Sequence, residues 1–181
     1  MTAKIYVSAK EREDDLLSPI VQRIHEIFED PKIRELKFIM TGVGAFNNDS
    51  ALTLHHILTE EKPSQLTLST LGYGTMAVPE LAIIAAGNTR WVRADAHIRL
   101  NVKWPSKYFT GSPTDEEREK GEGYQQCPGF LDQERLLDIV NDWLEVKNFA
   151  NRLFSGKDLE RWGFITGRGL DRELELLSKS S

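Results

Sequence analysis

The sequence predicts a single α/β domain built on a mostly parallel sheet. Short apolar runs of strand length are each followed by a glycine-containing turn and then by apolar residues at helical spacing. This unit recurs at intervals of about 30 residues, as in crossover connections between parallel strands. A chain of 181 residues with 40% hydrophobic and 28% charged residues can bury one core of its own. We therefore expect residues 1–181 to form one domain.

The elements follow from local patterns along the chain. The run Leu36 to Met40 is nearly continuous in apolar residues, which is typical of a buried parallel strand. Asp14 can cap a first helix that ends before Pro31, and Ser155 can begin a short helix that ends at 162–163. Strands are expected at 4–8, 36–40, 66–71, 91–94 and 97–102, and helices at 14–30, 51–59, 76–86, 131–153 and 155–162.

Three segments differ in character from the repeated units. Residues 105–129 are rich in Gly, Pro, Ser, Thr and charge and are expected to form a surface excursion. Residues 131–153 form an amphipathic pattern, here called the handle helix, and 166–181 form a polar tail with one leucine-rich patch.

Composition narrows the classes of function. The net charge of −5 and the lack of a basic stripe argue against nucleic acid and anionic membranes as partners. The lone Cys127 excludes an internal disulfide and a cysteine metal cluster. The charged N-terminal region predicts no signal peptide, and the longest apolar stretch, 76–87, is too short to span a bilayer. We expect a cytoplasmic protein.

Two glycine turns are candidate sites. The turn 41–45 precedes a helix and contains Gly42 and Gly44, whose backbone N–H groups can bind an anion or oxyanion. Glycine at such a turn is often present only because the backbone there has a positive φ. The corner at residues 72–76 places Thr75 between a glycine turn and an apolar helix. Capping of that helix is the simpler role for Thr75, because a β-branched secondary alcohol attacks less readily than serine.

Other candidate groups are few. His97, in a predicted strand, is the histidine best placed to act as a base near the corner, although a structural role is simpler. His55 and His56 are adjacent, so they point about 100° apart on a helix and one is expected to face the core or a neighbour. No dinucleotide, P-loop or metal-ligand spacing occurs, so neither cofactor nor metal is expected.

The order of these features resembles the proteolytic subunit of the Clp protease, within the Clp-protease/crotonase-like superfamily. The opening strand and helix and the strand 36–40 are similar to that family's opening. The family's Asn-Ser-Pro-Gly-Gly turn falls on 40–44, its Ala-Ser-Met corner on Gly74-Thr75-Met76, and its closing Leu-Ser-x-x-x-Ala-x-x-Tyr-Gly pattern on 154–163. The resemblance implies that family's fold with a helical handle, and a ligand cradle at Gly42, Gly44 and Met76.

The departures bear on activity. The resemblance places the nucleophile at Thr75, the base at Asn101 and the orienting acid at Asn151. Asparagine cannot accept a proton at neutral pH, so a relay that activates the hydroxyl is absent. The triad positions Thr75, Asn101 and Asn151 are therefore expected to be degenerate.

The resemblance implies a non-proteolytic relative that binds peptide or acyl groups. It also implies assembly with itself or with an active relative, as a trimer, hexamer or heptamer through the handle helix. A second interpretation is an enzyme with a relocated site, performing crotonase-like acyl chemistry or weak peptidase activity. In it the N–H groups of Gly44 and Met76 form the oxyanion hole and His97, Glu80 or Asp49 is the base. A third is an α/β oligomer with no catalytic history.

Overall fold

A computed structural model describes residues 1–8, 13–41, 46–99, 135–141, 143 and 153–166. A four-stranded parallel sheet forms the larger part, with strand order β1-β2-β3-β5. Its strands are β1 (Thr2–Ser8), β2 (Glu35–Thr41), β3 (Thr67–Tyr73) and β5 (Thr89–Val92). The mostly parallel sheet expected from the sequence is confirmed.

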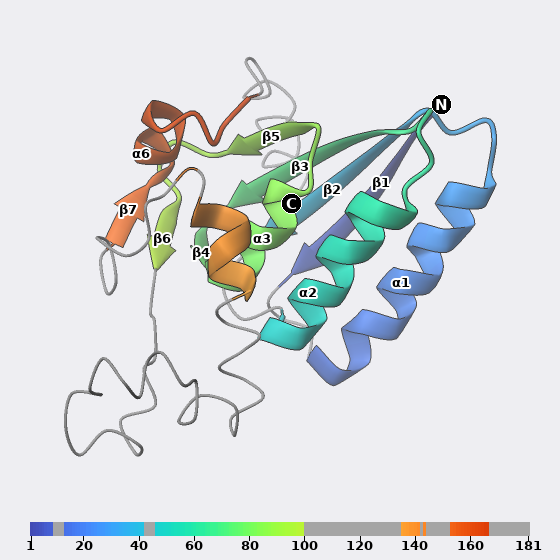
Figure 1. Cartoon of the computed structure of the whole chain (residues 1–181), viewed down its shortest axis with the longest axis horizontal. Coiled ribbons are helices and arrows are strands. Elements are labelled where there is room, and N and C mark those ends of the chain that lie inside the picture. The colour runs from blue at the N-terminus through green and yellow to red at the C-terminus, as the bar shows by residue number, and fades with distance from the viewer. Residues whose placement is uncertain (9–12, 42–45, 100–134, 142, 144–152, 167–181) are drawn as a thin grey trace, which may run out of the picture.

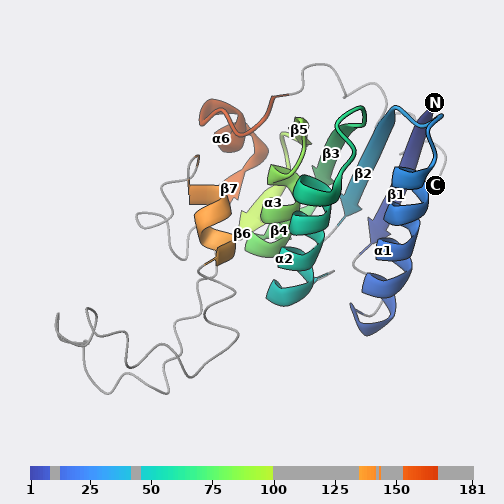
Figure 2. The same cartoon turned by 45° about the vertical axis from the view of Figure 1, so that its right-hand side comes forward.

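Helices lie against one face of this sheet (Figures 1 and 2). They are α1 (Glu13–Glu29), α2 (Asn48–His56) and α3 (Val78–Ala85), and α2 continues into the π-helical turn η1 (Ile57–Glu61). Asn47 caps α2, because its side chain accepts a hydrogen bond from the Ser50 N–H at 2.8 Å. No helix in the described part of the chain combines the length and apolarity needed to cross a membrane.

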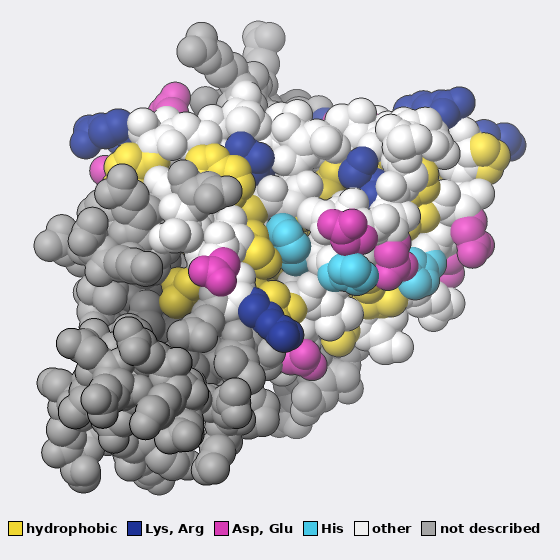
Figure 3. All heavy atoms as spheres, viewed as in Figure 1, with side chains coloured by type: hydrophobic (Ala, Val, Ile, Leu, Met, Phe, Trp, Pro, Cys, Tyr) yellow, Lys and Arg dark blue, Asp and Glu magenta, His cyan; other side chains and the backbone are white. Residues whose placement is uncertain are grey.

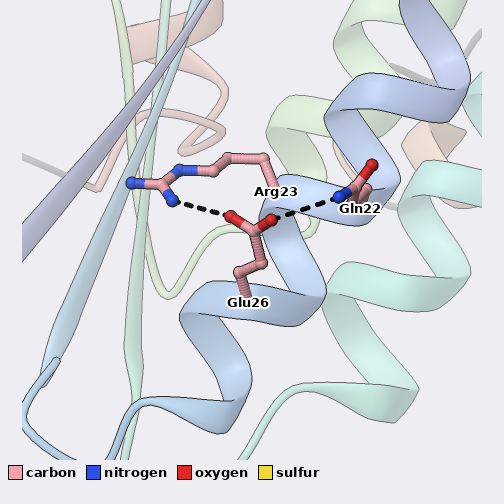
Figure 4. Close-up of polar contacts among 3 residues, drawn as sticks. All are labelled: Gln22, Arg23 and Glu26. Atoms are coloured by element: carbon pink, nitrogen blue, oxygen red, sulfur yellow. Dashed lines mark hydrogen bonds and ion pairs between the residues drawn. The ribbon is translucent and has the colours of Figure 1, made fainter.

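The solvent side of α1 is held by local polar pairs. Glu26 accepts hydrogen bonds from Arg23 at 2.7 Å and from Gln22 at 3.3 Å (Figure 4). These side chains are exposed, so each contact adds only a few tenths of a kcal/mol, about 0.3–0.5. The packing of Ile20, Ile24 and Ile27 fixes this helix to the sheet instead.

A second, smaller sheet stands beside the first and carries the candidate site. It contains β4 (Thr75–Ala77), β6 (His97–Arg99) and β7 (Leu153–Ser155), in the order β4-β6-β7. β4 and β6 are parallel, whereas β6 and β7 are antiparallel. The helix α6 (Gly156–Arg161) follows β7, with Ser155 as its cap, as predicted.

The first sheet carries apolar side chains on both faces. Leu36, Phe38 and Met40 of β2 point into the main core under the helices. On the opposite face, Ile39, Leu71 and Trp91 stand in register across three strands and are 5% exposed or less. The described side chains packed on this second cluster are Tyr73 and Ile165. Burial on both faces explains the near-continuous apolar character of the run Leu36 to Met40.

Several boundaries differ from those expected. Asp14, expected to cap the first helix, already lies within α1. The predicted handle helix ran from 131 to 153; residues 135–141 and 143 are helical, but Leu153 lies in β7. Leu136 and Val140, four residues apart, are fully buried on the helix face that meets the core. The strand expected at 91–94 begins and ends two residues earlier, as β5. The excursion at 105–129 and most of the tail lie outside the described residues.

Candidate functional site

The corner is shaped by two glycines with different roles. Gly74 has φ of 83°, a left-handed conformation that only glycine adopts without strain. Gly72 is needed for space, because a Cβ there would lie 2.5 Å from the Met76 sulfur and 2.6 Å from Ile84 Cδ1. The chain thus turns sharply at Gly74 and brings Met76 into the core, where its side chain is fully buried.

Thr75 lies in strand β4, and the expectation that it caps the following helix is wrong. The helix α3 begins at Val78, and Ala77 occupies the cap position with extended backbone. Thr75 pairs with β6 instead, and this pairing keeps it in the sheet, three residues before α3 begins. Its half-buried hydroxyl is therefore displaced from the helix N-terminus, where unpaired N–H groups would stabilise an alkoxide.

Glu80 forms a capping hydrogen bond at the start of α3. Its side chain is fully buried, and its Oε2 accepts a hydrogen bond from the Ala77 N–H at 2.9 Å. This is the reciprocal half of a capping box, in which a carboxylate at the third helical position satisfies the backbone at the cap. Glu80 thus serves the backbone of the corner and does not present a carboxylate base at the surface.

His97 is the predicted base that the fold brings beside Thr75. The two residues are register partners across β4 and β6, so their side chains leave the sheet on the same face. The His97 side chain is exposed, and the described residues show no hydrogen bond between its ring and the Thr75 hydroxyl. The arrangement brings a hydroxyl and an imidazole close together on one surface.

The pairing also orients the backbone at the corner. The His97 N–H donates to the Gly74 carbonyl at 3.0 Å, so the Gly74 carbonyl faces β6. Because residues along a strand alternate in direction, the N–H of Met76 faces β6, whereas those of Thr75 and Ala77 face the other edge. The Ala77 N–H is taken by Glu80. The Thr75 N–H therefore points away from β6, at the outer edge of the second sheet.

The remaining candidates are separate from the corner. Asp49 is exposed in the first turn of α2, with no hydrogen bond to the corner among the described residues. His55 is half-buried between α2 and α3, where its Nδ1 donates to the Ala82 carbonyl at 2.8 Å, and His56 is exposed, as the adjacency of the two predicted. Burial lowers the pKa of His55.

Histidines also lie over the helical face of the molecule. Figure 3 shows histidine side chains close to acidic side chains on the face formed by α1 and α2. There His25 Nε2 lies 3.3 Å from Glu61 Oε2, with both side chains about half exposed. The described residues contain no group of three or more His, Cys, Asp or Glu side chains that could hold a metal ion.

Four predicted site residues, Gly42, Gly44, Asn101 and Asn151, lie outside the described residues. The cradle that they and Met76 would form, and the degenerate character of the triad, stay predictions.

Ser155 lies on the same face of the second sheet as Thr75 and His97, whereas its sequence context predicts only the start of a helix. It is the register partner of His97 on the side away from Thr75. Its N–H and its hydroxyl both donate to Asp158 Oδ2, at 2.9 and 2.8 Å. These two bonds lower the pKa of the Asp158 carboxyl, and the bond from the backbone N–H has the larger effect. The Ser-x-x-Asp spacing is a capping signal visible in the sequence, but its position beside His97 follows only from the pairing of β6 and β7.

Comparisons with known proteins place this geometry in a known architecture. A scan against protein-family models and a search of curated proteins give no match. Among solved structures, a ClpP1 mutant from Listeria monocytogenes matches over 91% of this chain and 88% of its own, with a TM-score of 0.57 and 12% identity. A peptidase from Plasmodium falciparum matches over 91% of this chain and 93% of its own, with a TM-score of 0.62 and 11% identity. At these identities the likeness is one of fold, and the chain therefore has the Clp-protease/crotonase-like α/β fold.

Proposed function

We propose that this chain is a non-proteolytic Clp-protease-like protein that binds peptide or acyl groups. The observation that carries the proposal is the position of Thr75 inside strand β4, ahead of α3 and half-buried. A secondary alcohol there has neither the helix N-terminus nor a hydrogen-bonded base to activate it as a nucleophile. Asn101 and Asn151 at the other two triad positions support the same conclusion.

The proposal includes self-association, or assembly with an active relative, through the handle helix. Support comes from the resemblance to a family of ring-forming proteins and from this helix itself. Its Leu136 and Val140 are buried in the core, and Leu137, Ile139 and Trp143 pack against the same core but are only partly buried. The exposed parts of Leu137, Ile139 and Trp143 leave apolar surface that suits contacts with a second subunit. Mass measurement in solution tests this part, and a monomer at all concentrations would contradict it.

A relocated catalytic site is the second candidate function. It is favoured by one observation, the register pairing of Thr75 with the exposed His97. On this alternative, His97 takes the proton of the Thr75 hydroxyl as that hydroxyl attacks an acyl carbon, and returns the proton to the leaving group.

Hydrolysis of fluorogenic peptides and acyl esters tests both candidates. For the non-proteolytic protein, we expect wild type, Thr75→Ala and His97→Ala to give the same background rate. The exposed His56 on α2 provides a matched control, His56→Ala. Turnover by wild type that falls at least about 100-fold in both Thr75→Ala and His97→Ala, but not in His56→Ala, would overturn the proposal and establish the relocated site.

Restoring the predicted triad gives a complementary test. The triple variant Thr75→Ser, Asn101→His, Asn151→Asp is expected to gain measurable hydrolysis, because a primary alcohol, a base and an orienting carboxylate return together. The double variant that lacks Asn101→His is the control. A correctly folded triple variant that is no more active than this control would contradict the assignment of a degenerate triad.

A further inference from the structure

The second sheet has one buried face and one face that points away from the core. Met76, Ile98 and Phe154 form a register row that is 9% exposed or less. Because side chains alternate along a strand, the residues on either side of this row point the opposite way. This outward face consists of two rows, Thr75-His97-Ser155 and Ala77-Arg99-Leu153.

The chemistry of the outward face differs from that of the whole chain. His97 and Arg99 are exposed on the central strand, and their positions two residues apart place the side chains about 7 Å from each other. Leu153 is 61% exposed beside Arg99 and adds an apolar side chain to this face. None of the six residues is acidic, although the chain carries a net charge of −5.

The described carboxylates nearest in sequence already have partners. Asp158 Oδ2 accepts both hydrogen bonds from Ser155, at the β7 margin of the face. Asp95 forms an ion pair with Arg93 at 2.7 Å, before β6 begins. No described carboxylate forms a hydrogen bond or ion pair with His97 or Arg99. The centre of the face thus carries the Arg99 guanidinium and the His97 imidazole, with no described carboxylate bonded to either.

We propose that the outward face binds an acidic peptide, which names the ligand class of the non-proteolytic protein and so rests on that proposed function. A peptide carboxylate lies between His97 and Arg99, where the guanidinium donates charge-assisted hydrogen bonds and the imidazole N–H donates a further one. A neighbouring apolar side chain of the peptide packs on Leu153. One guanidinium and one imidazole are too few donors for a nucleic acid, whose affinity depends on many phosphate contacts.

Binding of short peptides to the full chain tests the proposal. Three hexapeptides alternate leucine with glutamate, with glutamine or with lysine, and carry the same uncharged dye for fluorescence anisotropy. At low salt the glutamate peptide is expected to bind about tenfold more tightly than the glutamine peptide, and the lysine peptide most weakly. Added salt should narrow this difference, because exposed charges are screened.

Variants locate the effect on the face. Arg99→Gln is expected to remove most of the tenfold preference while leaving the glutamine peptide unchanged, whereas Leu153→Ser weakens both peptides. Arg23→Gln on α1 changes the net charge equally and is the matched control, since Arg23 pairs with Glu26 far from this face in sequence and element.

Three outcomes would overturn the proposal: equal binding of the glutamate and glutamine peptides, equal effects of Arg99→Gln and Arg23→Gln, or tighter binding of a single-stranded oligonucleotide than of the glutamate peptide. If any of these outcomes is found and no peptide is hydrolysed, the proposed non-proteolytic function still holds. Cleavage of the glutamate peptide that depends on Thr75 would instead contradict the non-proteolytic function, whether or not the face selects acidic peptides.

Discussion

Glu80 illustrates how one side chain can have a role that its sequence context hides. It lies in the helix after the corner, where a carboxylate is a reasonable base, yet it is buried against the Ala77 N–H. A capping box is recognised by a Ser or Thr at the cap, and here the cap residue is alanine. The pattern was therefore invisible in the sequence, whereas Ser155 and Asp158 carry the same pattern in its recognisable form.

His55 makes stability depend on pH at the residue scale. Burial lowers the pKa of His55, partly offset by its bond to the Ala82 carbonyl and by Glu60. A group with a lowered folded-state pKa binds fewer protons in the folded than in the unfolded protein. Its contribution to stability is thus present above the unfolded pKa of about 6.5 and is lost as the pH falls through the folded value.

Replacing His55 by asparagine tests this dependence. His55→Asn keeps a side-chain N–H donor near the position of Nδ1 but cannot titrate. The loss in free energy of unfolding between pH 7.5 and pH 5, measured by urea denaturation, should be smaller in His55→Asn than in wild type. His56→Asn is the matched control. An equal reduction in both variants, or none in His55→Asn, would contradict the assignment.

At the scale of elements, the least predictable piece is β4. Its three residues run directly into α3, and although Pro79 indicates a helix start nearby, nothing in β4 itself indicates a strand. The strand exists because Thr75, Met76 and Ala77 pair with residues 97–99, about 20 positions later. Short strands that depend on a distant partner carry little local signal, so the sequence suggested a helix starting at the corner.

Gly87, at the end of α3, gives a prediction about the contact of this helix with β3. A Cβ at this position would meet Thr70 Oγ1 and lie 2.8 Å from the Thr89 carbonyl. Thr70 cannot move freely, because its buried hydroxyl donates to the Ile84 carbonyl at 2.7 Å. Gly87→Ala should lower the free energy of unfolding by about 1–3 kcal/mol, as measured by chemical denaturation.

A double-mutant cycle with Thr70→Ala identifies the cause. Thr70→Ala removes both side-chain atoms that crowd position 87, so the double variant should lose less stability than the sum of the two single variants. Strictly additive losses would show that the contact with Thr70 is not the reason for glycine at this position.

At the scale of the whole molecule, Arg90 ties together parts of the chain that are distant in sequence. From β5, its Nε donates to the Phe164 carbonyl at 2.7 Å, and its guanidinium lies 4.7 Å from the centre of the Trp143 ring. Trp143 in turn meets Phe164 edge to face at 5.4 Å. Thr166 adds two bonds to the backbone of Arg90, one from its N–H to the Arg90 carbonyl and one from the Arg90 N–H to its hydroxyl.

Removing the guanidinium should therefore loosen the handle helix and the segment after α6 together. Arg90→Met keeps the aliphatic stem and is expected to lower the free energy of unfolding by about 2 kcal/mol, from the lost charged hydrogen bond and cation–π contact. Arg90→Lys, which keeps the charge but not the planar fork, should fall between Arg90→Met and wild type. Equal stability of wild type and Arg90→Met in urea would rule out this role.

The sequence by itself determined the class of the fold, the order of most elements and the presence of a sharp corner before α3. It could do so because apolar spacing, glycine turns and helix caps act within a few residues of each other. The tertiary structure alone decided that Thr75 belongs to a strand and that His97 lies between Thr75 and Ser155. It also decided that the Glu80 carboxylate is buried against the Ala77 N–H. These facts depend on pairing between residues far apart in the chain, for which local patterns carry no information.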